Sequence, residues 1–217
     1  MTWGYHTGMP SLPVAVLHDP ATLAEALSEH DVCLLTGFPD SESTIALRSA
    51  LQQLQQSGAL RAAEVGNGAG QLLRTAIRGD DTGWMDSDSG TSALDYLACL
   101  QRLRHELNQR LYVGLAEEEA HFACYPPGAA YQRHRDQFHG TDARVLSIVS
   151  YLNSDWSAED GGALRLYLPT GSIDVLPHAG TSIVFRSHLE HEVLPATRER
   201  LSIAAWLRKS ESKAHSW

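Results

Sequence analysis

The chain has 217 residues, of which 43% are hydrophobic and 20% charged, so it is long enough to bury the core of one large domain. Its net charge of −9 argues against a nucleic acid as the main partner, because binding a phosphate backbone requires a basic surface. The three cysteines are too widely spaced for a disulfide framework. The sequence shows neither a signal peptide nor an apolar run of the roughly 20 residues that span a membrane, so we expect a cytoplasmic protein. A monomer is the default expectation.

Helical patterns dominate the first half of the chain, after an irregular lead-in over residues 1–18. Asp19 followed by Pro20 predicts a helix start, with aspartate as the cap and proline at the first helical position. A leucine stripe between Leu94 and Leu111 predicts a long amphipathic helix. Helices are therefore expected over residues 20–30, 41–57 and 92–111, and the apolar run Val32–Thr36 suits a buried strand.

Two stretches of this half are interpreted as irregular. Residues 58–90 are rich in glycine and polar side chains, and Gly66–Gly70 has the glycine spacing of a phosphate-binding loop. This segment lacks the GKS/T ending and the strand-loop-helix setting of such a loop, so we interpret it as a mobile surface loop. The run Glu117–Glu119 predicts a solvated turn.

The second half of the chain has the alternation of short strands. Clusters of Gly, Pro, Asn and Asp separate eight expected strands, at residues 121–125, 131–136, 144–152, 163–167, 172–175, 181–185, 190–194 and 201–207. Strands at such regular spacing are typical of a sandwich or barrel. The chain is thus predicted to be a single α+β domain over residues 1–217, with helical support from 1–115 packed on one face of a β-roll formed by 116–208.

A histidine and a carboxylate stand two positions apart at His134 and Asp136. In an extended segment these side chains share one face, so both can reach one metal ion. His191, which follows the predicted strand at 181–185, is the candidate third ligand, although the loop histidines 139, 178 and 188 stay open as alternatives. Two histidines and one carboxylate with open positions suit non-haem Fe(II) better than a closed structural zinc site. An open Fe(II) site needs a bidentate co-substrate, and a 2-oxo acid can supply it. The far carboxylate of such an acid would need a fixed cation, which Arg200 can provide.

An ordered set of motifs surrounds these residues and spans roughly residues 60–208. The motifs are Ile77-Arg-Gly-Asp80 with Trp84, Ala123-Cys-Tyr-Pro-Pro-Gly128, Tyr131-x-x-His134-x-Asp136, Tyr151-Leu-Asn-x-Asp-Trp156, Gly161-Gly162-x-Leu164-Arg165, and His191-Glu-Val-x-Pro195 with Arg200 and Trp206. With them the chain resembles the 2-oxoglutarate- and Fe(II)-dependent dioxygenases. Within that superfamily it is similar to the prolyl 4-hydroxylases related to the hypoxia-factor prolyl hydroxylases and their bacterial relatives.

The resemblance implies a double-stranded β-helix, of the jelly-roll or cupin type, with Fe(II), 2-oxoglutarate, O₂ and, as a further candidate, ascorbate (vitamin C). Fe(II) would be held by His134, Asp136 and His191, while Arg200 and Tyr151 would bind the distal carboxylate of 2-oxoglutarate. Tyr125 would lie beside the metal and co-substrate, and Leu164 and Trp206 would line the pocket. Trp84, Asp80 and Arg144 would lie on the substrate side. Asp80 and Arg144 would also pair with each other and so tie the loop at 58–90 to the barrel.

Two positions depart from the family pattern. Ala204 stands where the animal enzymes carry a hydroxyl near the co-substrate, and His121 replaces an apolar neighbour. From the residues alone, Tyr125, Tyr131 and Tyr151 also fit ordinary aromatic side chains of a barrel core.

The resemblance implies hydroxylation of a prolyl residue in a protein, of the peptidyl-proline 4-dioxygenase type, with release of succinate and CO₂. The carboxylate at Asp136 favours hydroxylation, because relatives with Ala or Gly there halogenate instead. Bacterial relatives suggest elongation factor Tu as the target. The alternatives are a hydroxylase of a free amino acid or small molecule, and a non-catalytic β-barrel that senses a metal or 2-oxoglutarate.

Overall fold

The computed structural model describes residues 12–63, 77–137 and 143–210 of the chain. The glycine-rich loop predicted at 66–70 and the tail beyond Ser210 lie outside these residues. Among the described helices, none combines the length and the apolar character that crossing a bilayer requires.

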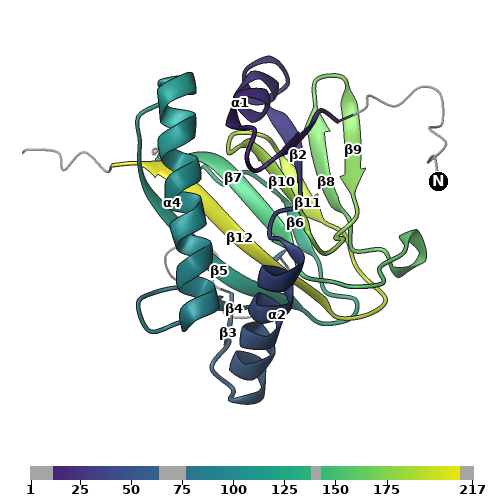
Figure 1. Cartoon of the computed structure of the whole chain (residues 1–217). Coiled ribbons are helices and arrows are strands. Elements are labelled where there is room, and N and C mark those ends of the chain that lie inside the picture. Colours follow the sequence, from purple (N-terminus) through teal and green to yellow (C-terminus); the bar gives the residue numbers. More distant parts are fainter. Residues whose placement is uncertain (1–11, 64–76, 138–142, 211–217) are drawn as a thin grey trace, which may run out of the picture.

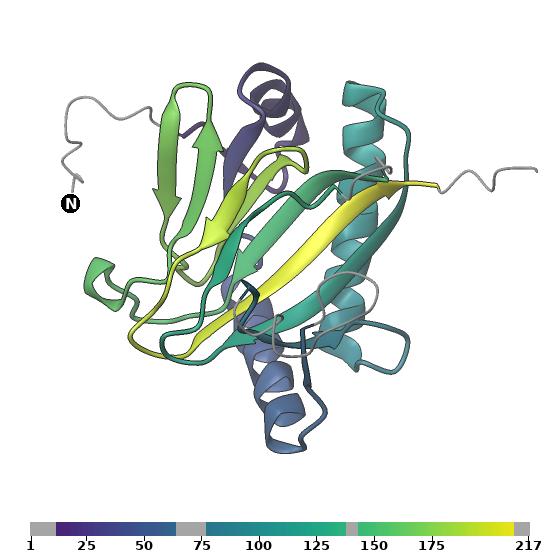
Figure 2. The same cartoon turned by 180° about the vertical axis from the view of Figure 1, so that it is seen from behind.

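Two β-sheets and a layer of helices make up the described structure (Figure 1). The strands are β1 (Val14–Val16), β2 (Val32–Thr36), β3 (Arg61–Ala62), β4 (Asp81–Trp84), β5 (Leu115–Tyr125), β6 (Tyr131–His134), β7 (Arg144–Tyr151), β8 (Leu164–Leu168), β9 (Gly171–Val175), β10 (Thr181–Arg186), β11 (His191–Val193) and β12 (Arg200–Lys209). Eight of them form one sheet in the order β1-β2-β10-β7-β12-β5-β4-β3, and the other four form a second sheet in the order β6-β11-β8-β9. Figure 2 shows β12, in yellow, running through the middle of the larger sheet.

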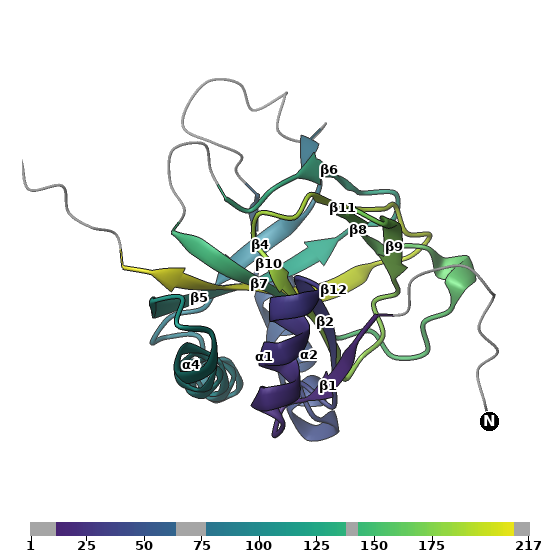
Figure 3. The ribbon, with the colours of Figure 1, turned by 90° about the horizontal axis from the view of Figure 1, so that it is seen from above.

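The helices α1 (Pro20–Glu29), α2 (Ser41–Gln56) and α4 (Thr91–Leu111) lie on one face of the larger sheet, and the smaller sheet lies on the other (Figure 3). A short 3₁₀ helix covers Ala158–Asp160. Asp19 caps α1 as predicted, by accepting a hydrogen bond from the backbone N–H of Thr22. The α+β architecture with helices on one face is therefore confirmed.

Apolar side chains fill both interfaces between these layers. Leu100, Leu103 and Leu107 of α4 are buried in the core between the helices and the larger sheet, but Leu94, at the start of the predicted stripe, is 43% exposed. A second core lies between the two sheets and includes Tyr151 and Phe185. The functional side chains described below occupy one end of this inter-sheet space.

Two predictions of irregular structure were wrong, for related reasons. Residues 117–119 belong to β5 and do not form a turn: Arg104 neutralises Glu118 at 2.6 Å, while Arg144 and Arg208 neutralise Glu119 at 2.8 and 2.9 Å. The strands β1, β3 and β4 were not predicted, because they are short and gain strand structure only by pairing: β1 with β2, β3 with β4, and β4 with β5. Consequently β1 to β4, from the part predicted as helical support, extend the larger sheet.

Candidate active site

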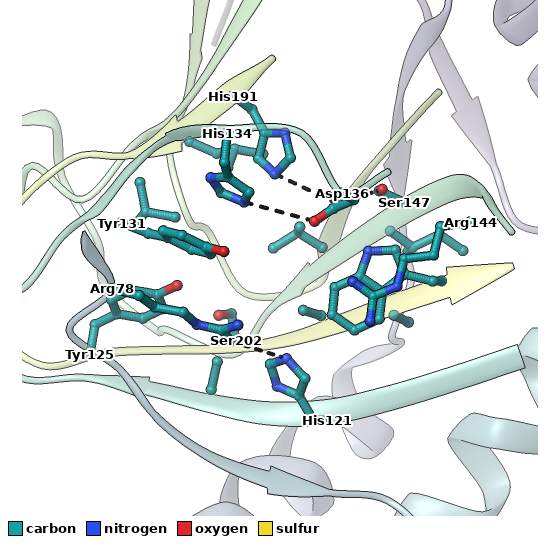
Figure 4. Close-up of a pocket in the computed structure, with 18 of the residues that line it drawn as sticks. Arg78, His121, Tyr125, Tyr131, His134, Asp136, Arg144, Ser147, His191 and Ser202 are labelled. Atoms are coloured by element: carbon teal, nitrogen blue, oxygen red, sulfur yellow. Dashed lines mark hydrogen bonds and ion pairs between the residues drawn. The ribbon is translucent and has the colours of Figure 1, made fainter. Parts of the chain in front are cut away.

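The three predicted metal ligands converge at the end of the inter-sheet space (Figure 4). His134 ends β6 and faces His191, the first residue of β11, across an antiparallel pair of strands. Asp136 lies two residues beyond β6 and reaches both imidazoles: its carboxylate oxygens are 3.8 Å from His134 Nε2 and 3.6 Å from His191 Nε2. One ligand atom from each residue lies within 4.8 Å of the others, which is close enough to bind a single ion.

Backbone carbonyls fix the tautomers of both histidines. His134 Nδ1 lies 2.7 Å from the carbonyl oxygen of Gln132, and His191 Nδ1 lies 3.1 Å from that of Leu189. Because a carbonyl only accepts hydrogen bonds, each Nδ1 carries the proton and each Nε2 presents its lone pair toward the carboxylate. Both imidazoles are thus oriented as metal ligands.

The charge states at this site suit a cation. Burial, together with the nearby His191, lowers the pKa of His134 to about 4, so this imidazole is neutral at pH 7. Burial raises the pKa of Asp136, but His191, His134 and a hydrogen bond from Ser147 outweigh that effect and leave it below its ordinary value. Two imidazole nitrogens and one carboxylate are the donor set of a non-haem Fe(II) site with open positions.

The alternative histidines do not join this group. His188 is half exposed and lies 3.7 Å from Asp31, His178 is exposed, and residue 139 lies outside the described residues. Within the described ranges, the triad is the only cluster of at least three His, Cys, Asp or Glu side chains whose ligand atoms converge.

A second group of polar atoms lies deeper between the sheets. Arg200, which is 1% exposed, donates from Nε to the carbonyl oxygen of Gly162 and from Nη1 to Ser202 Oγ, each at 2.9 Å. Its Nη2 and the Tyr151 hydroxyl are buried with no hydrogen-bond partner. Burying such donors without a partner is costly, and together they match the two oxygens of a carboxylate. This arrangement fits the predicted site for the distal carboxylate of 2-oxoglutarate.

The glycine pair at 161–162 allows the chain to approach Arg200 closely. Both glycines have a φ of +69°. A Cβ atom on Gly161 would lie 2.7 Å from the carbonyl oxygen of Pro195, and one on Gly162 would lie 3.3 Å from Arg200 Cδ. Only glycine tolerates both the positive φ and these close approaches. The Gly161-Gly162 pair therefore allows the Gly162 carbonyl oxygen to lie where it accepts the hydrogen bond from Arg200.

A cavity of about 190 Å³ joins the two groups of residues. Six of the predicted site residues outside the triad line it, namely Tyr125, Leu164, Trp206, Trp84, Arg144 and Arg200. Tyr151 is not one of its lining residues. Asp80 is buried behind the wall, where it accepts two hydrogen bonds from Arg78 at 2.7 and 2.9 Å. The predicted pairing of Asp80 with Arg144 was therefore wrong, because Arg78 takes the carboxylate of Asp80 and Arg144 donates to Glu119.

A family model described as the 2OG-Fe(II) oxygenase superfamily matches residues 120–208. Prolyl hydroxylase EGLN3 of Mus musculus is 30% identical over 205 residues, which cover 89% of this chain and 85% of the relative. The chain belongs to the 2OG-Fe(II) oxygenase superfamily.

Solved structures agree with this assignment. A Pseudomonas putida prolyl-4-hydroxylase superposes with a TM-score of 0.80 at 40% identity, covering 88% of this oxygenase and 98% of that chain. A Trichoplax adhaerens prolyl hydroxylase, in complex with a hypoxia inducible factor oxygen degradation domain peptide fragment, gives a TM-score of 0.81 at 26% identity, with 93% and 94% covered. They group this oxygenase with the prolyl hydroxylases and confirm the double-stranded β-helix. This family implies Fe(II) as the cofactor and 2-oxoglutarate and O₂ as co-substrates.

Ser147 is a site residue that the sequence did not reveal. It lies on β7, where its hydroxyl donates to Asp136 Oδ2 at 2.6 Å and lies 2.9 Å from Ser187 Oγ. Nothing distinguishes this serine from others in the sequence, because its role arises only from the packing of β7 beneath the triad. It orients the carboxylate from behind, as outer-shell partners of metal ligands commonly do.

Replacing Ser147 by alanine is expected to weaken Fe(II) binding by about 10- to 100-fold, because the carboxylate loses the hydrogen bond that fixes its orientation. Titration of the metal-free protein with Fe(II) under anaerobic conditions measures the effect. Ser150→Ala is the matched control, since Ser150 is a buried serine of the same strand that bonds Tyr96 and Ser182 on the helical side. Equal metal affinities in the two variants would contradict this role.

His121 lies at the opposite side of the cavity and is fully buried. Its Nδ1 is 3.0 Å from the backbone carbonyl oxygen of Phe122, so Nε2 is free to accept a hydrogen bond from Arg78 at 3.3 Å. Its ring also packs edge-on against Trp84. His121 therefore connects Arg78 and Trp84, at the end of the predicted substrate loop, to strand β5.

This network predicts a loss of stability in mild acid. Burial and the charge of Arg78 lower the pKa of His121 to about 4, whereas an unfolded histidine titrates near 6.5. Below pH 6.5 the unfolded state binds more protons than the folded state, so stability falls as the pH falls from 6.5 toward 4. We expect His121 to account for about 2 kcal/mol of unfolding free energy lost between pH 7 and pH 5.

Urea unfolding of the metal-free protein at the two pH values measures this loss. His121→Gln should reduce it, whereas His30→Gln, which alters an exposed histidine at the end of α1, should leave it unchanged. If the loss is the same in all three proteins, His121 is not its source.

Proposed function

We propose that this oxygenase hydroxylates a prolyl residue in a protein substrate while it converts 2-oxoglutarate to succinate and CO₂. The observation that carries the proposal is the triad of His134, Asp136 and His191 beside the buried, unpartnered donors of Arg200 and Tyr151. That combination provides for both a metal ion and a carboxylate co-substrate. The choice of proline rests on the relatives, which are named prolyl hydroxylases.

The triad would hold Fe(II) from one side and leave its other positions to the co-substrate and O₂. The bound metal supplies the oxidising chemistry, and the protein supplies position. Arg200 would pair with the far carboxylate of 2-oxoglutarate and Tyr151 would donate to it, which places the 2-oxo acid group toward the triad. Because Gly162 and Ser202 already hold the guanidinium, little ordering is needed when the co-substrate binds.

The mouth of the cavity suits the ring of a prolyl residue. Tyr131 stacks on His134 with ring centroids 3.6 Å apart, and Trp206 lies opposite with Arg144 3.6 Å above its ring. Trp84, which is 55% exposed, adds an indole at the entrance. These aromatic surfaces can pack against the ring and exclude water from the reacting carbon.

Succinate formation and mass spectrometry together test the proposal. With Fe(II), 2-oxoglutarate and O₂, the protein should form succinate, and a proline-containing peptide or protein should gain the mass of one oxygen on proline. The alternative is a hydroxylase of a free amino acid or small molecule. It would be favoured if the protein forms succinate and hydroxylates such a molecule but yields no hydroxylated peptide. Absence of succinate under all conditions would leave only a sensing barrel.

We infer elongation factor Tu as the target protein from the resemblance to bacterial relatives, ascorbate as an activating reductant, and a cytoplasmic monomer as the working form. Incubation with purified elongation factor Tu, followed by digestion and mass spectrometry, tests the target. Light scattering tests the oligomeric state.

A further inference from the structure

Arg135 stands between two predicted metal ligands in the sequence, His134 and Asp136, and its side chain is largely exposed. Strand β6 ends at His134, and the side chain of Arg135 is 59% exposed. Arg135 lines both the metal cavity and an open groove beside it, so it marks the place where the two meet. A polypeptide that leaves the metal along this groove must pass Arg135.

The charge of Arg135 is only partly neutralised. Glu190 Oε2 accepts two hydrogen bonds from Arg133, whereas Arg135 lies 3.6 Å from Oε1, beyond hydrogen-bond distance. One carboxylate therefore serves two guanidinium groups. Among the described residues, the Arg135 guanidinium makes no hydrogen bond.

The other arginines of the cavity are already engaged. Arg78 makes a bidentate pair with Asp80, Arg144 donates to Glu119, and Arg200 is buried at the proposed co-substrate end. At the cavity mouth, Arg135 is thus the arginine best placed to take a carboxylate from solvent, and its planar guanidinium can do so bidentately.

The adjoining groove has the character of a surface for an extended chain. Tyr167, Leu168, Pro169 and Leu189 contribute apolar surface, and Arg133 lies 3.7 Å above the ring of Tyr167. The groove has two acidic residues: Asp31 lies 3.8 Å from Arg186 and 3.7 Å from His188, and Glu190 pairs with Arg133 and Arg135. The groove therefore offers apolar contact along its length and a partly free positive charge at the end nearest the metal.

We propose that Arg135 selects substrates that carry an acidic residue within about three positions of the target proline. An extended chain advances about 3.3 Å per residue, so such a residue passes the lip of the cavity while the proline is at the metal. The protein as a whole has a net charge of −9, which does not attract acidic substrates from a distance. The attraction between Arg135 and an acidic residue therefore acts locally, within the roughly 8 Å over which charges are screened at physiological salt. This inference rests on the proposed prolyl hydroxylation.

The test uses short proline-centred peptides that carry aspartate, alanine or lysine at each of the three positions on either side of the proline. Oxygen incorporation measured by mass spectrometry gives kcat/KM for each peptide. For the wild-type protein we expect the aspartate peptide to exceed the lysine peptide by about 10-fold or more at one position. Arg135→Glu should reverse that preference, and Arg135→Gln should bring the ratio close to one.

A ratio between two peptides is used because Arg135 adjoins two metal ligands, and any loss of metal affinity reduces both rates equally. Arg110→Glu is the charge-matched control: Arg110 pairs with Glu106 on α4, on the helical side of the larger sheet, and its variant should keep the wild-type ratio. Equal turnover of aspartate and lysine peptides, or an unchanged ratio in Arg135→Gln, overturns this inference alone. Failure to hydroxylate any peptide of the series overturns it together with the proposed function.

Discussion

Replacing Asp136 by alanine is expected to abolish succinate formation from 2-oxoglutarate and to weaken Fe(II) binding by well over about 100-fold. The basis is that outer-shell changes alone cost about 10- to 100-fold in metal affinity, and this change removes a ligand outright. Asp136 is also the residue that both histidines face, at 3.8 and 3.6 Å, so its loss leaves the two imidazoles without the anionic donor. The measurements are succinate release by mass spectrometry and anaerobic Fe(II) titration.

The folded state of the variant can be checked separately. Asp136 is buried and bonded to Ser147, so thermal unfolding of the metal-free variant must show a single cooperative transition before the activity is interpreted. Asp174→Ala is the matched control, because Asp174 is an exposed carboxylate of β9 that pairs with Arg165. Near-normal succinate release from Asp136→Ala would refute the assignment of the metal site.

Replacing Arg200 by lysine is expected to raise the KM for 2-oxoglutarate by roughly 100-fold, with a smaller effect on kcat at saturating co-substrate. Truncating one partner of a buried charge pair costs about 2 to 5 kcal/mol, and lysine cannot reproduce the planar fork. The co-substrate would lose the donor at Nη2, which has no partner within the described residues. Tyr151→Phe, which removes the neighbouring hydroxyl alone, should raise KM by about 10-fold.

Steady-state kinetics with varied 2-oxoglutarate separate the two parameters. Arg165→Lys serves as control, since Arg165 is a half-exposed arginine on β8 that forms a bidentate pair with Asp174. If Arg200→Lys folds and binds Fe(II) normally but shows an unchanged KM, the co-substrate carboxylate binds elsewhere.

Much of the fold was accessible from local sequence. The three helices start and end within a few residues of their predicted limits, because caps, prolines and apolar periodicity act within one or two turns. The eight predicted strands likewise occur, because short apolar runs between turn residues have few alternatives. The strand β4 was missed: its sequence, Asp-Thr-Gly-Trp, has little strand propensity and is ordered by its pairing with β5.

The site divides in a similar way. The motifs and their fixed order in the sequence predicted His134, Asp136, His191 and Arg200, although the residue types alone left the loop histidines 139, 178 and 188 open as third ligands. Their hydrogen-bond and ion-pair partners became known only from the three-dimensional structure. Ser147 donates a hydrogen bond to Asp136, and Asp80 pairs with Arg78 instead of Arg144. Arg135 lies at the cavity mouth, where it shares the carboxylate of Glu190 with Arg133. These contacts join strands that are distant in the chain. Local sequence patterns could not predict them, because the choice of partner depends on strand register and sheet packing.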